Sequence, residues 1–399
     1  MYCKCGDIKY AWKLFDRMLR RDVVSWTSVI SAYCSMGKLN ESIVLFERMK
    51  MEGLEPNEFT WHALMTGYAK GGDCHGAFAI FCRMTRERLV PDLVTWNALI
   101  SGFARSNQSL EAVKLFGEML SIGIRPNHVT VTGLLPACGL MHSLHKGREI
   151  HSLIYRFGLE TNVYVASALV DMYSRCGSVK DAMYVFEAIP VRNVTLWNVI
   201  IGCCGRHGLV DFSIELFERM LQEGFRVNEV TLACVLSACS HGGLVEKGLE
   251  IFRSMQDKHR IVASKEHYAC VVDLLCRSGR VEDAYELVKN MSIEITESIV
   301  GSFFSGCKIH GRRDLAKQLA QDLQGMDLER PGGLVTLSNM YAADGEWEEV
   351  GSVRKLMKDK GVNKKPGFSS VTKRDGSVEC DLGEILDNVN HGSEEFLAG

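Results

Sequence analysis

Proline is scarce in this sequence, with seven residues in 399 against a usual share of about 5%. Because proline interrupts helices, its scarcity favours a helical chain. The sequence also has no uninterrupted apolar stretch near the roughly 18 residues that span a bilayer, so we expect no membrane partner. The chain is too long for one ordinary globular core, which predicts several domains or a repeat array.

An excess of positive charge is missing as well, since the formal net charge is -3. This balance argues against a protein that binds nucleic acid by broad neutralisation of phosphates. It leaves open a protein that reads unstacked bases along one local groove.

The 15 cysteines lack the spacing of disulfide frameworks or zinc sites, because no C-x-x-C occurs. The close pairs are Cys3 with Cys5 and Cys203 with Cys204. Many cysteines fall at apolar positions of expected helices, where a free thiol behaves as a small hydrophobic group. We interpret them as buried, reduced thiols, which indicates a reducing compartment.

Motifs of catalysis are also missing. Zinc deaminases need an H-x-E and a C-x-x-C, and neither pattern occurs. The sequence contains no H-E-x-x-H and no G-x-x-x-x-G-K-[ST] loop either. We expect His241 and His310 to be turn or cap residues at helix ends. The sequence therefore predicts no enzyme, no cofactor and no metal site.

A repeat with a period of 35 residues is the main feature of the sequence. Four residue types recur with this spacing: Trp26, Trp61 and Trp96; Phe46, Phe81 and Phe116; Met49, Met84 and Met119; Pro56, Pro91 and Pro126. A shared period of this length indicates an array of small structural units.

Each unit contains two helical patterns. In the first unit, Trp26, Val29, Ile30 and Tyr33 follow i, i+3, i+4, i+7 spacing, and Ser42, Leu45, Phe46 and Met49 repeat it after Gly37. Gly53 and Pro56 interrupt the chain before the next unit. Because one helix pair cannot bury its apolar stripe alone, neighbouring pairs must stack. The expected fold is all-α, a solenoid of tandem helix–turn–helix repeats.

The period divides the chain into eight repeats after a partial one. They span residues 23–57, 58–92, 93–127, 128–162, 163–193, 194–228, 229–264 and 265–296. Residues 1–22 match the back part of the short repeat 163–193, so we expect a truncated N-terminal repeat there.

These units resemble a known family. VTWNALISGFARSNQSLEAVKLFGEMLSIGIRPN (94–127) and the long and short units are similar to plant pentatricopeptide-repeat (PPR) proteins of the long–short (PLS) subclass. HYACVVDLLCRSGRVEDAYELVKNM (267–291), SGCKIHGRRDLAKQLA (305–320) and LSNMYAADGEWEEVGSVRKLMKDKGVNKKPG (337–367) resemble its last repeat and its E region. The resemblance implies a right-handed α-solenoid with an E region at 297–367 and no DYW deaminase domain.

The C-terminal part departs from the family pattern in two places. Val300 stands where the E region usually has tryptophan, and Phe368-Ser369-Ser370 replaces the usual Cys-Ser-Trp. Residues 368–399 form a divergent tail, and the sequence leaves the folding of residues 371–399 open. Lys364 and Lys365 are expected to be solvated, with phosphate contact as the alternative.

The resemblance implies that the second, fifth and last residue of each repeat face one nucleotide. Second and fifth residues are i, i+3 neighbours and share a helix face. Apolar second residues can sandwich a base, and here they are Val24, Phe59, Val94, Val129 and Tyr164. The fifth and last residues would read the base edge by hydrogen bonds.

Six pairs of fifth and last residues are the candidates for base reading. They are Thr27/Asn57, His62/Asp92, Asn97/Asn127, Thr132/Asn162, Ser167/Asn193 and Asn198/Asn228. The family code implies adenine for a hydroxyl with Asn and cytosine for two Asn, which gives A-?-C-A-A-C from 5′ to 3′. His62/Asp92 is outside the code and leans towards uracil or guanine. Ala233/Ser264 and Ala269/Thr296 are assigned no base.

Helix capping is the alternative interpretation of the last residues, since Asn and Asp are among the best N-caps. Capping does not explain the hydroxyl and amide side chains at most fifth positions, so we favour recognition together with capping.

The favoured function is therefore sequence-specific binding of single-stranded RNA, as the site-recognition factor for organellar C-to-U editing. The deaminase would come from a partner, which the E region would recruit with accessory proteins. Two alternatives remain, stabilisation or processing of an organellar transcript, and a tetratricopeptide-like protein scaffold. The family resemblance implies a location in the mitochondrion or the chloroplast.

Overall fold

The computed structural model describes residues 8–106, 108–291, 293–322, 332–343, 345–359, 371–372 and 378–379. It divides into two units, residues 1–294 and 295–399, and each is considered by itself. Lys364, Lys365, the Phe368–Ser370 segment and nearly all of the predicted tail lie outside the described residues.

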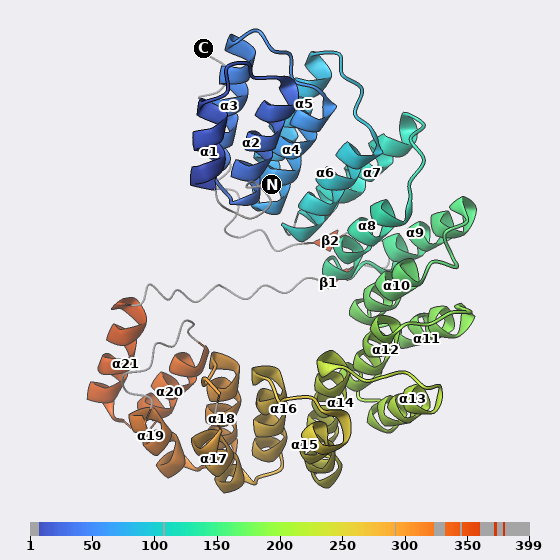
Figure 1. The fold of residues 1–399 in the computed structure, drawn as a ribbon. Helices are drawn as coiled ribbons and strands as arrows, with labels where there is room; N and C mark the ends of the chain where they lie inside the picture. Colours follow the sequence, from blue (N-terminus) through green and yellow to red (C-terminus); the bar gives the residue numbers. More distant parts are fainter. Residues whose placement is uncertain are drawn as a thin grey trace. The chain divides into compact units, whose positions relative to one another are not determined.

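Unit 1 is an α-solenoid of helix pairs (Figure 1). Its helices are α1 (Ile8–Asp16), α2 (Val23–Ser35), α3 (Leu39–Met51), α4 (Glu58–Lys70), α5 (Cys74–Arg86), α6 (Leu93–Arg105), α7 (Ser109–Ser121), α8 (His128–Leu140), α9 (Leu144–Phe157), α10 (Val163–Arg175), α11 (Val179–Ala188), α12 (Val194–Arg206), α13 (Val210–Gln222), α14 (Glu229–Gly242), α15 (Val245–His259), α16 (Lys265–Arg277) and α17 (Val281–Asn290).

The described residues of unit 2 form four further helices and a short two-stranded sheet. The helices are α18 (Glu297–Ile309), α19 (Arg313–Asp322), α20 (Gly332–Ala343) and α21 (Trp347–Asp359). The sheet pairs β1 (Val371–Thr372) with β2 (Val378–Glu379) in antiparallel register. Val300 is buried in α18, so valine fills a core position there. In the described part of the chain, no helix is long and apolar enough to cross a membrane.

Polar caps and left-handed glycines set the ends of the helices. Asn57 lies at the N-cap of α4 with an extended backbone, and its side chain accepts the backbone N–H of Thr60. Gly37 joins the two helices of its pair with φ +73°, and Gly53 ends the second helix with φ +79°. These conformations are natural for Asn caps and for glycine, which explains why these residues interrupt the apolar pattern.

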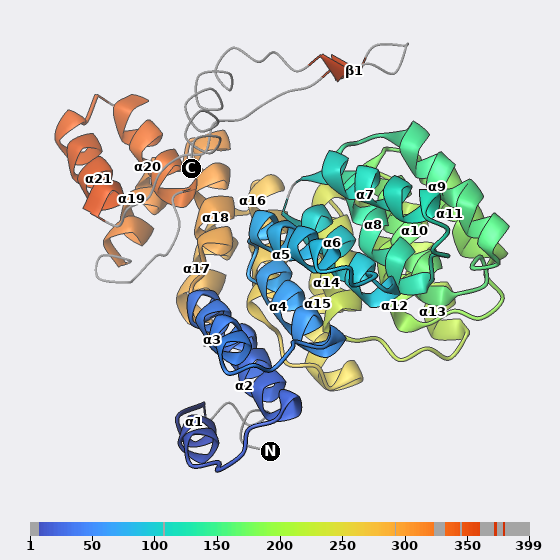
Figure 2. The same cartoon turned by 90° about the horizontal axis from the view of Figure 1, so that it is seen from above.

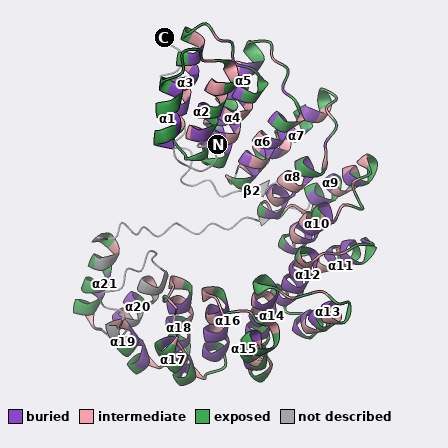
Figure 3. Cartoon of the chain, in the orientation of Figure 1, coloured by how far each residue is buried: buried purple, intermediate pink, exposed green. Residues whose placement is uncertain are grey.

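The predicted apolar stripes form the core (Figure 3). Trp26, Phe46 and Met49 are fully buried, and the rings of Phe46 and Trp61 meet edge to face at 4.7 Å. Tyr33 was predicted as part of this stripe but is only half buried. Phe–Trp contacts of this kind also cross three other repeat boundaries, between Phe15 and Trp26, Phe81 and Trp96, and Phe186 and Trp197.

First helices stack directly on one another, so α4 packs between α2 and α6 and the same order continues to α16. Second helices pack against the first helix of their own repeat and of the next one. Figures 1 and 2 show the two resulting layers in unit 1. The start of each first helix therefore keeps one face that no second helix covers.

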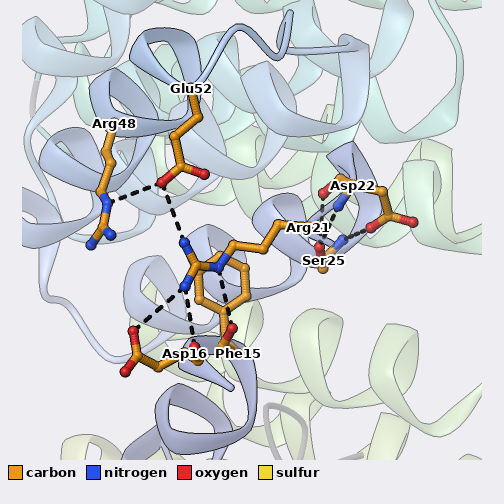
Figure 4. Close-up of polar contacts among 7 residues, drawn as sticks. All are labelled: Phe15, Asp16, Arg21, Asp22, Ser25, Arg48 and Glu52. Carbon is orange, nitrogen blue, oxygen red and sulfur yellow. Dashed lines mark hydrogen bonds and ion pairs between the residues drawn. The ribbon is translucent and has the colours of Figure 1, made fainter. Parts of the chain in front are cut away.

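In the shorter repeats, an arginine that follows the second helix packs against the end of that helix. The Arg21 guanidinium lies 5.0 Å from the centre of the Phe15 ring, donates to the Phe15 carbonyl and pairs with Asp16 and Glu52 (Figure 4). Arg192 makes the corresponding contacts with the ring and carbonyl of Phe186 and with Glu187 and Glu223. The planar guanidinium suits this site because it stacks on a ring and binds carboxylates at its edge.

Arg88 occupies a backbone position that normally requires glycine. Its φ is +63°, whereas the corresponding residues Gly53, Gly123 and Gly224 adopt about +80°. A side chain in this left-handed region costs roughly 1–2 kcal/mol. We predict that Arg88→Gly raises the free energy of unfolding by about 1 kcal/mol, measured by urea denaturation followed by circular dichroism.

His142 provides the matched control for this prediction. It also has a positive φ, of +50°, but its ring donates from Nδ1 to the carbonyl of Arg175 at 2.8 Å. His142→Gly relieves strain and loses that hydrogen bond, so we expect a smaller gain than for Arg88→Gly. An equal or larger gain at position 142 would contradict the explanation by backbone strain.

Candidate nucleic-acid interface

Apolar side chains stand exposed at the second position of the first helices. The predicted base-sandwiching residues Val24, Phe59, Val94, Val129 and Tyr164 are all exposed, from 44% for Val129 to 72% for Phe59. Val230 has the same place in α14 and is also exposed. The sequence prediction did not include Val230, although the repeat register identifies it. The solenoid thus presents a row of uncovered apolar groups, in which Thr195 at the start of α12 is a polar member.

Three of the six predicted polar pairs are joined by a direct hydrogen bond. His62 Nε2 lies 2.7 Å from Asp92 Oδ1, and Asn198 Nδ2 donates to Asn228 Oδ1 at 3.1 Å. Asn97 Nδ2 donates to Asn127 Oδ1 at 3.4 Å, a longer contact. The structure therefore brings these fifth and last residues together at the start of the first helices.

The other three pairs are not joined directly. Thr27, Thr132 and Ser167 donate instead to the backbone carbonyls of Val23, Val129 and Val163 in their own helices. Their hydroxyls are short and prefer these local acceptors. Their partners Asn57, Asn162 and Asn193 still lie at the N-caps of the next first helices.

Capping and base reading use different atoms of the last residues. In all six, a side-chain oxygen accepts a backbone N–H in the first turn of the following helix. In each of the five Asn, this leaves the two N–H groups of the amide for another partner. The capping role is confirmed, and it does not compete with a role in recognition.

Asp92 is the one carboxylate among the six last residues. Burial would raise the pKa of its carboxyl, but hydrogen bonds from the Thr95 amide and hydroxyl, together with His62, lower the pKa overall. Asp92 is therefore an ionised acceptor at neutral pH, unlike the amides of the other five. An acceptor at this place suits a base with a ring N–H, in agreement with the predicted preference for uracil or guanine.

A hollow of about 550 Å³ lies between α2 and α4. Thr27, Phe59 and His62 line one end, and Lys70 at the end of α4 also lines it. One groove thus offers an apolar ring, polar groups and a cation. These are the three kinds of contact that an unpaired nucleotide can use.

Basic residues at the ends of first helices were missed by the sequence analysis, which considered only Lys364 and Lys365 for phosphate contact. Lys70, Arg105, Arg175, Arg206 and Arg277 are each the last residue of their first helix. Arg175 and Arg206 both pair with Asp171, at 2.8 and 4.0 Å, and Arg277 pairs with Asp273. The repeat register would have revealed this row, which supplies local positive charge in a chain of net charge -3.

The described residues contain no group of three or more His, Cys, Asp or Glu side chains that could hold a metal ion. His241 and His310 lie at the ends of α14 and α18, as expected for turn and cap residues.

Comparison with protein families matches this chain to three repeat and motif descriptions. The PPR repeat family matches residues 21–70 and 91–139. The PPR repeat matches residues 1–23, 59–89, 164–194, 195–225, 230–259 and 266–293. The E motif matches residues 310–372.

Curated relatives from Arabidopsis thaliana are similar over nearly the whole chain. One pentatricopeptide repeat-containing protein is 47% identical over 371 residues, which is 93% of this chain and 70% of that protein. A putative pentatricopeptide repeat-containing protein is 34% identical over 97% of this chain and 49% of its own length. The chain thus spans about half the length of several relatives it matches. The names of two others include the words chloroplastic and mitochondrial.

Solved structures share the fold. The pentatricopeptide repeat protein PPR10 from maize has a TM-score of 0.66 and 18% identity, covering 91% of this chain and 58% of that one. PPR10 in complex with an 18-nt psaJ RNA element has a TM-score of 0.65 and 15% identity, covering 90% of this chain and 60% of that one.

Proposed function

This chain belongs to the pentatricopeptide-repeat family and carries its E motif, and on that premise we propose that it binds single-stranded RNA sequence-specifically, with about one nucleotide per repeat. The observation that carries the proposal is the alternation of exposed apolar residues and polar pairs along the starts of the stacked first helices. PPR10, which shares the fold, has been crystallised with RNA.

Each base would lie between the second residues of two successive repeats. Phe59 and Val94 would form such a pair, and the base between them would meet the joined His62 and Asp92 side chains. Stacking on apolar or aromatic groups contributes about 1–3 kcal/mol per base and accepts any base. Sequence preference would then come from the polar pair at the base edge.

The finer proposal is recognition of a C-to-U editing site by a protein of the PLS subclass. The E motif at residues 310–372 supports it, since that region would recruit a partner that supplies the deaminase. The 31-residue repeat 163–193, which stands between repeats of 35 residues, supports the subclass. Relatives whose names place them in chloroplasts and mitochondria support an organellar location.

Selection from a randomised RNA pool tests the binding proposal. We expect the full chain to enrich single-stranded RNAs that contain A-?-C-A-A-C, because each joined or capped pair presents a defined set of donors and acceptors. The measurement is the enriched motif, read by sequencing at physiological salt, since low salt exaggerates binding to phosphates. Enrichment of unrelated sequences would refute the assigned pairs, and the absence of RNA binding would refute the function.

A further inference from the structure

A buried threonine hydroxyl lies beneath several of the polar pairs. Thr60, Thr95, Thr130 and Thr231 each occupy the third residue of a first helix and are completely buried. Each hydroxyl contacts both the fifth and the last residue of the preceding repeat.

Thr130 shows the arrangement in full. Its hydroxyl lies 2.6 Å from Asn97 Oδ1 and 3.1 Å from Asn127 Oδ1, and it accepts the backbone N–H of Asn127 at 3.1 Å. Asn127 Oδ1 also accepts the backbone N–H of Thr130 at 3.0 Å. One side chain therefore ties both members of the pair to the helix end.

The same network occurs independently around Thr231. Its hydroxyl lies 2.7 Å from Asn198 Oδ1 and 2.9 Å from Asn228 Oδ1, and it accepts the backbone N–H of Asn228 at 3.1 Å. Repeats 93–127 and 194–228, which are not adjacent in the chain, thus hold their Asn/Asn pairs in the same orientation.

The hydrogen bonds that the Asn97/Asn127 pair already makes within the protein determine which of its atoms remain for a base. The backbone N–H of Thr130 is a donor only, so Asn127 must turn its oxygen inward. The Thr130 hydroxyl has one hydrogen, and its shorter contact directs that hydrogen to Asn97 Oδ1. Both amide oxygens are then engaged, and Asn97 Nδ2 uses one N–H on Asn127 Oδ1. The groups left for a ligand are the other N–H of Asn97 and the two N–H groups of Asn127, all of them donors.

A pair that offers donors suits a base edge that carries acceptors. Cytosine presents acceptors at N3 and O2, whereas uracil presents an N–H at N3 that would face another donor. The inward orientation of the oxygens therefore discriminates between two pyrimidines of nearly the same shape.

Two of the other predicted pairs lack this threonine. Val165 and Leu196 occupy the third position after the Thr132/Asn162 and Ser167/Asn193 pairs, and neither pair is joined by a direct hydrogen bond. All three directly joined pairs lie above a threonine, and the Thr27 hydroxyl, although not joined to Asn57, lies 2.7 Å from the Thr60 hydroxyl.

We propose that Thr130 and Thr231 are specificity-determining positioning residues, which lock the amides of the Asn/Asn pairs above them so that those pairs accept cytosine and reject uracil. The inference rests on the proposed function, since it concerns how the same pairs read RNA. Neither threonine touches the base, because both are buried.

The test compares Thr130→Val with Thr130→Ser in the full chain. Affinity is measured for four RNAs that differ only at the nucleotide of repeat 93–127. We expect Thr130→Val to reduce the preference for cytosine over uracil by about tenfold, the effect of one lost hydrogen bond. Thr130→Ser keeps the hydroxyl and should retain the preference, and preferences at the other nucleotides should not change.

Thr231→Val is the second, independent variant and should change only the nucleotide of repeat 194–228. It decides the same question if Thr130→Val folds poorly, although the native Val165 shows that valine is accepted at this position. Wild-type discrimination that persists in the valine variants would overturn the positioning role and leave RNA binding intact. A wild-type chain with no base preference would instead overturn the proposed function.

Discussion

Trp197→Ala is expected to lower the free energy of unfolding by about 3–5 kcal/mol, the usual cost of removing a large buried ring. Trp197 is fully buried, and its ring meets Phe186 edge to face at 4.8 Å. The guanidinium groups of Arg192 and Arg219 lie 5.8 and 5.6 Å from its centre. The substitution therefore leaves a cavity between two repeats and removes the surface on which both arginines rest. Urea denaturation followed by circular dichroism measures the loss.

Two variants control for this prediction. Trp347 is 68% exposed in α21, so Trp347→Ala should change the stability by no more than about 0.5 kcal/mol. The indole N–H of Trp197 has no hydrogen-bond partner among the residues that the structure describes. Trp197→Phe removes that unpaired group and keeps a ring, so it should cost less than half as much as alanine. A loss below about 1 kcal/mol for Trp197→Ala would show that the repeat interface does not depend on this ring.

Asn127→Asp is expected to convert the preference of repeat 93–127 from cytosine to uracil. The inward oxygen of Asn127 caps α8 through Thr130, and a carboxylate can make the same bond. The outward group changes from an N–H donor to an acceptor, which suits the ring N–H of uracil and repels the N3 acceptor of cytosine. Because one favourable contact is lost and an unfavourable one is gained, the ratio of affinities should change by roughly tenfold to a hundredfold.

Binding of RNAs that differ only at this nucleotide measures the effect. Asn228→Asp is the matched control, since it makes the same change in repeat 194–228 and should leave the nucleotide of repeat 93–127 unaffected. The native Asp92 shows that this position accepts a carboxylate in the same cap geometry. An unchanged cytosine preference in Asn127→Asp would contradict the assignment of Asn127 to base reading.

Much of the fold could be predicted from the sequence because its signals are local and repeated. The spacing of Trp26, Phe46 and Met49 predicts buried helix faces, and all three are buried. Caps such as Asn57 act on the helix that directly follows them, so their place in the repeat was enough to identify them. Tyr33 belongs to the same stripe but is only half buried, because apolar spacing alone does not show which part of a stripe the neighbouring helix covers.

The candidate interface was only partly predictable. The repeat register placed five apolar second residues on one exposed face, namely Val24, Phe59, Val94, Val129 and Tyr164. It did not distinguish the pairs of fifth and last residues that share a direct hydrogen bond from the pairs that do not. That difference depends on the fifth residue together with its neighbours in the next repeat. The Asn97 amide bonds to both Asn127 and Thr130, whereas the Thr27 hydroxyl bonds to Thr60 and not directly to Asn57. Residues 30 or more positions apart meet there only because first helices stack.

The sequence by itself determined the repeat, the helix ends and the apolar stripes, since each depends on neighbours within one or two turns. The tertiary structure alone decided which amide oxygens of Asn97 and Asn127 are engaged and that Lys70 lines the same hollow as the exposed ring of Phe59. The physical reason is that a side-chain amide carries an acceptor oxygen and a donor NH₂ group. The residue packed beneath it determines which of the two stays exposed to a ligand.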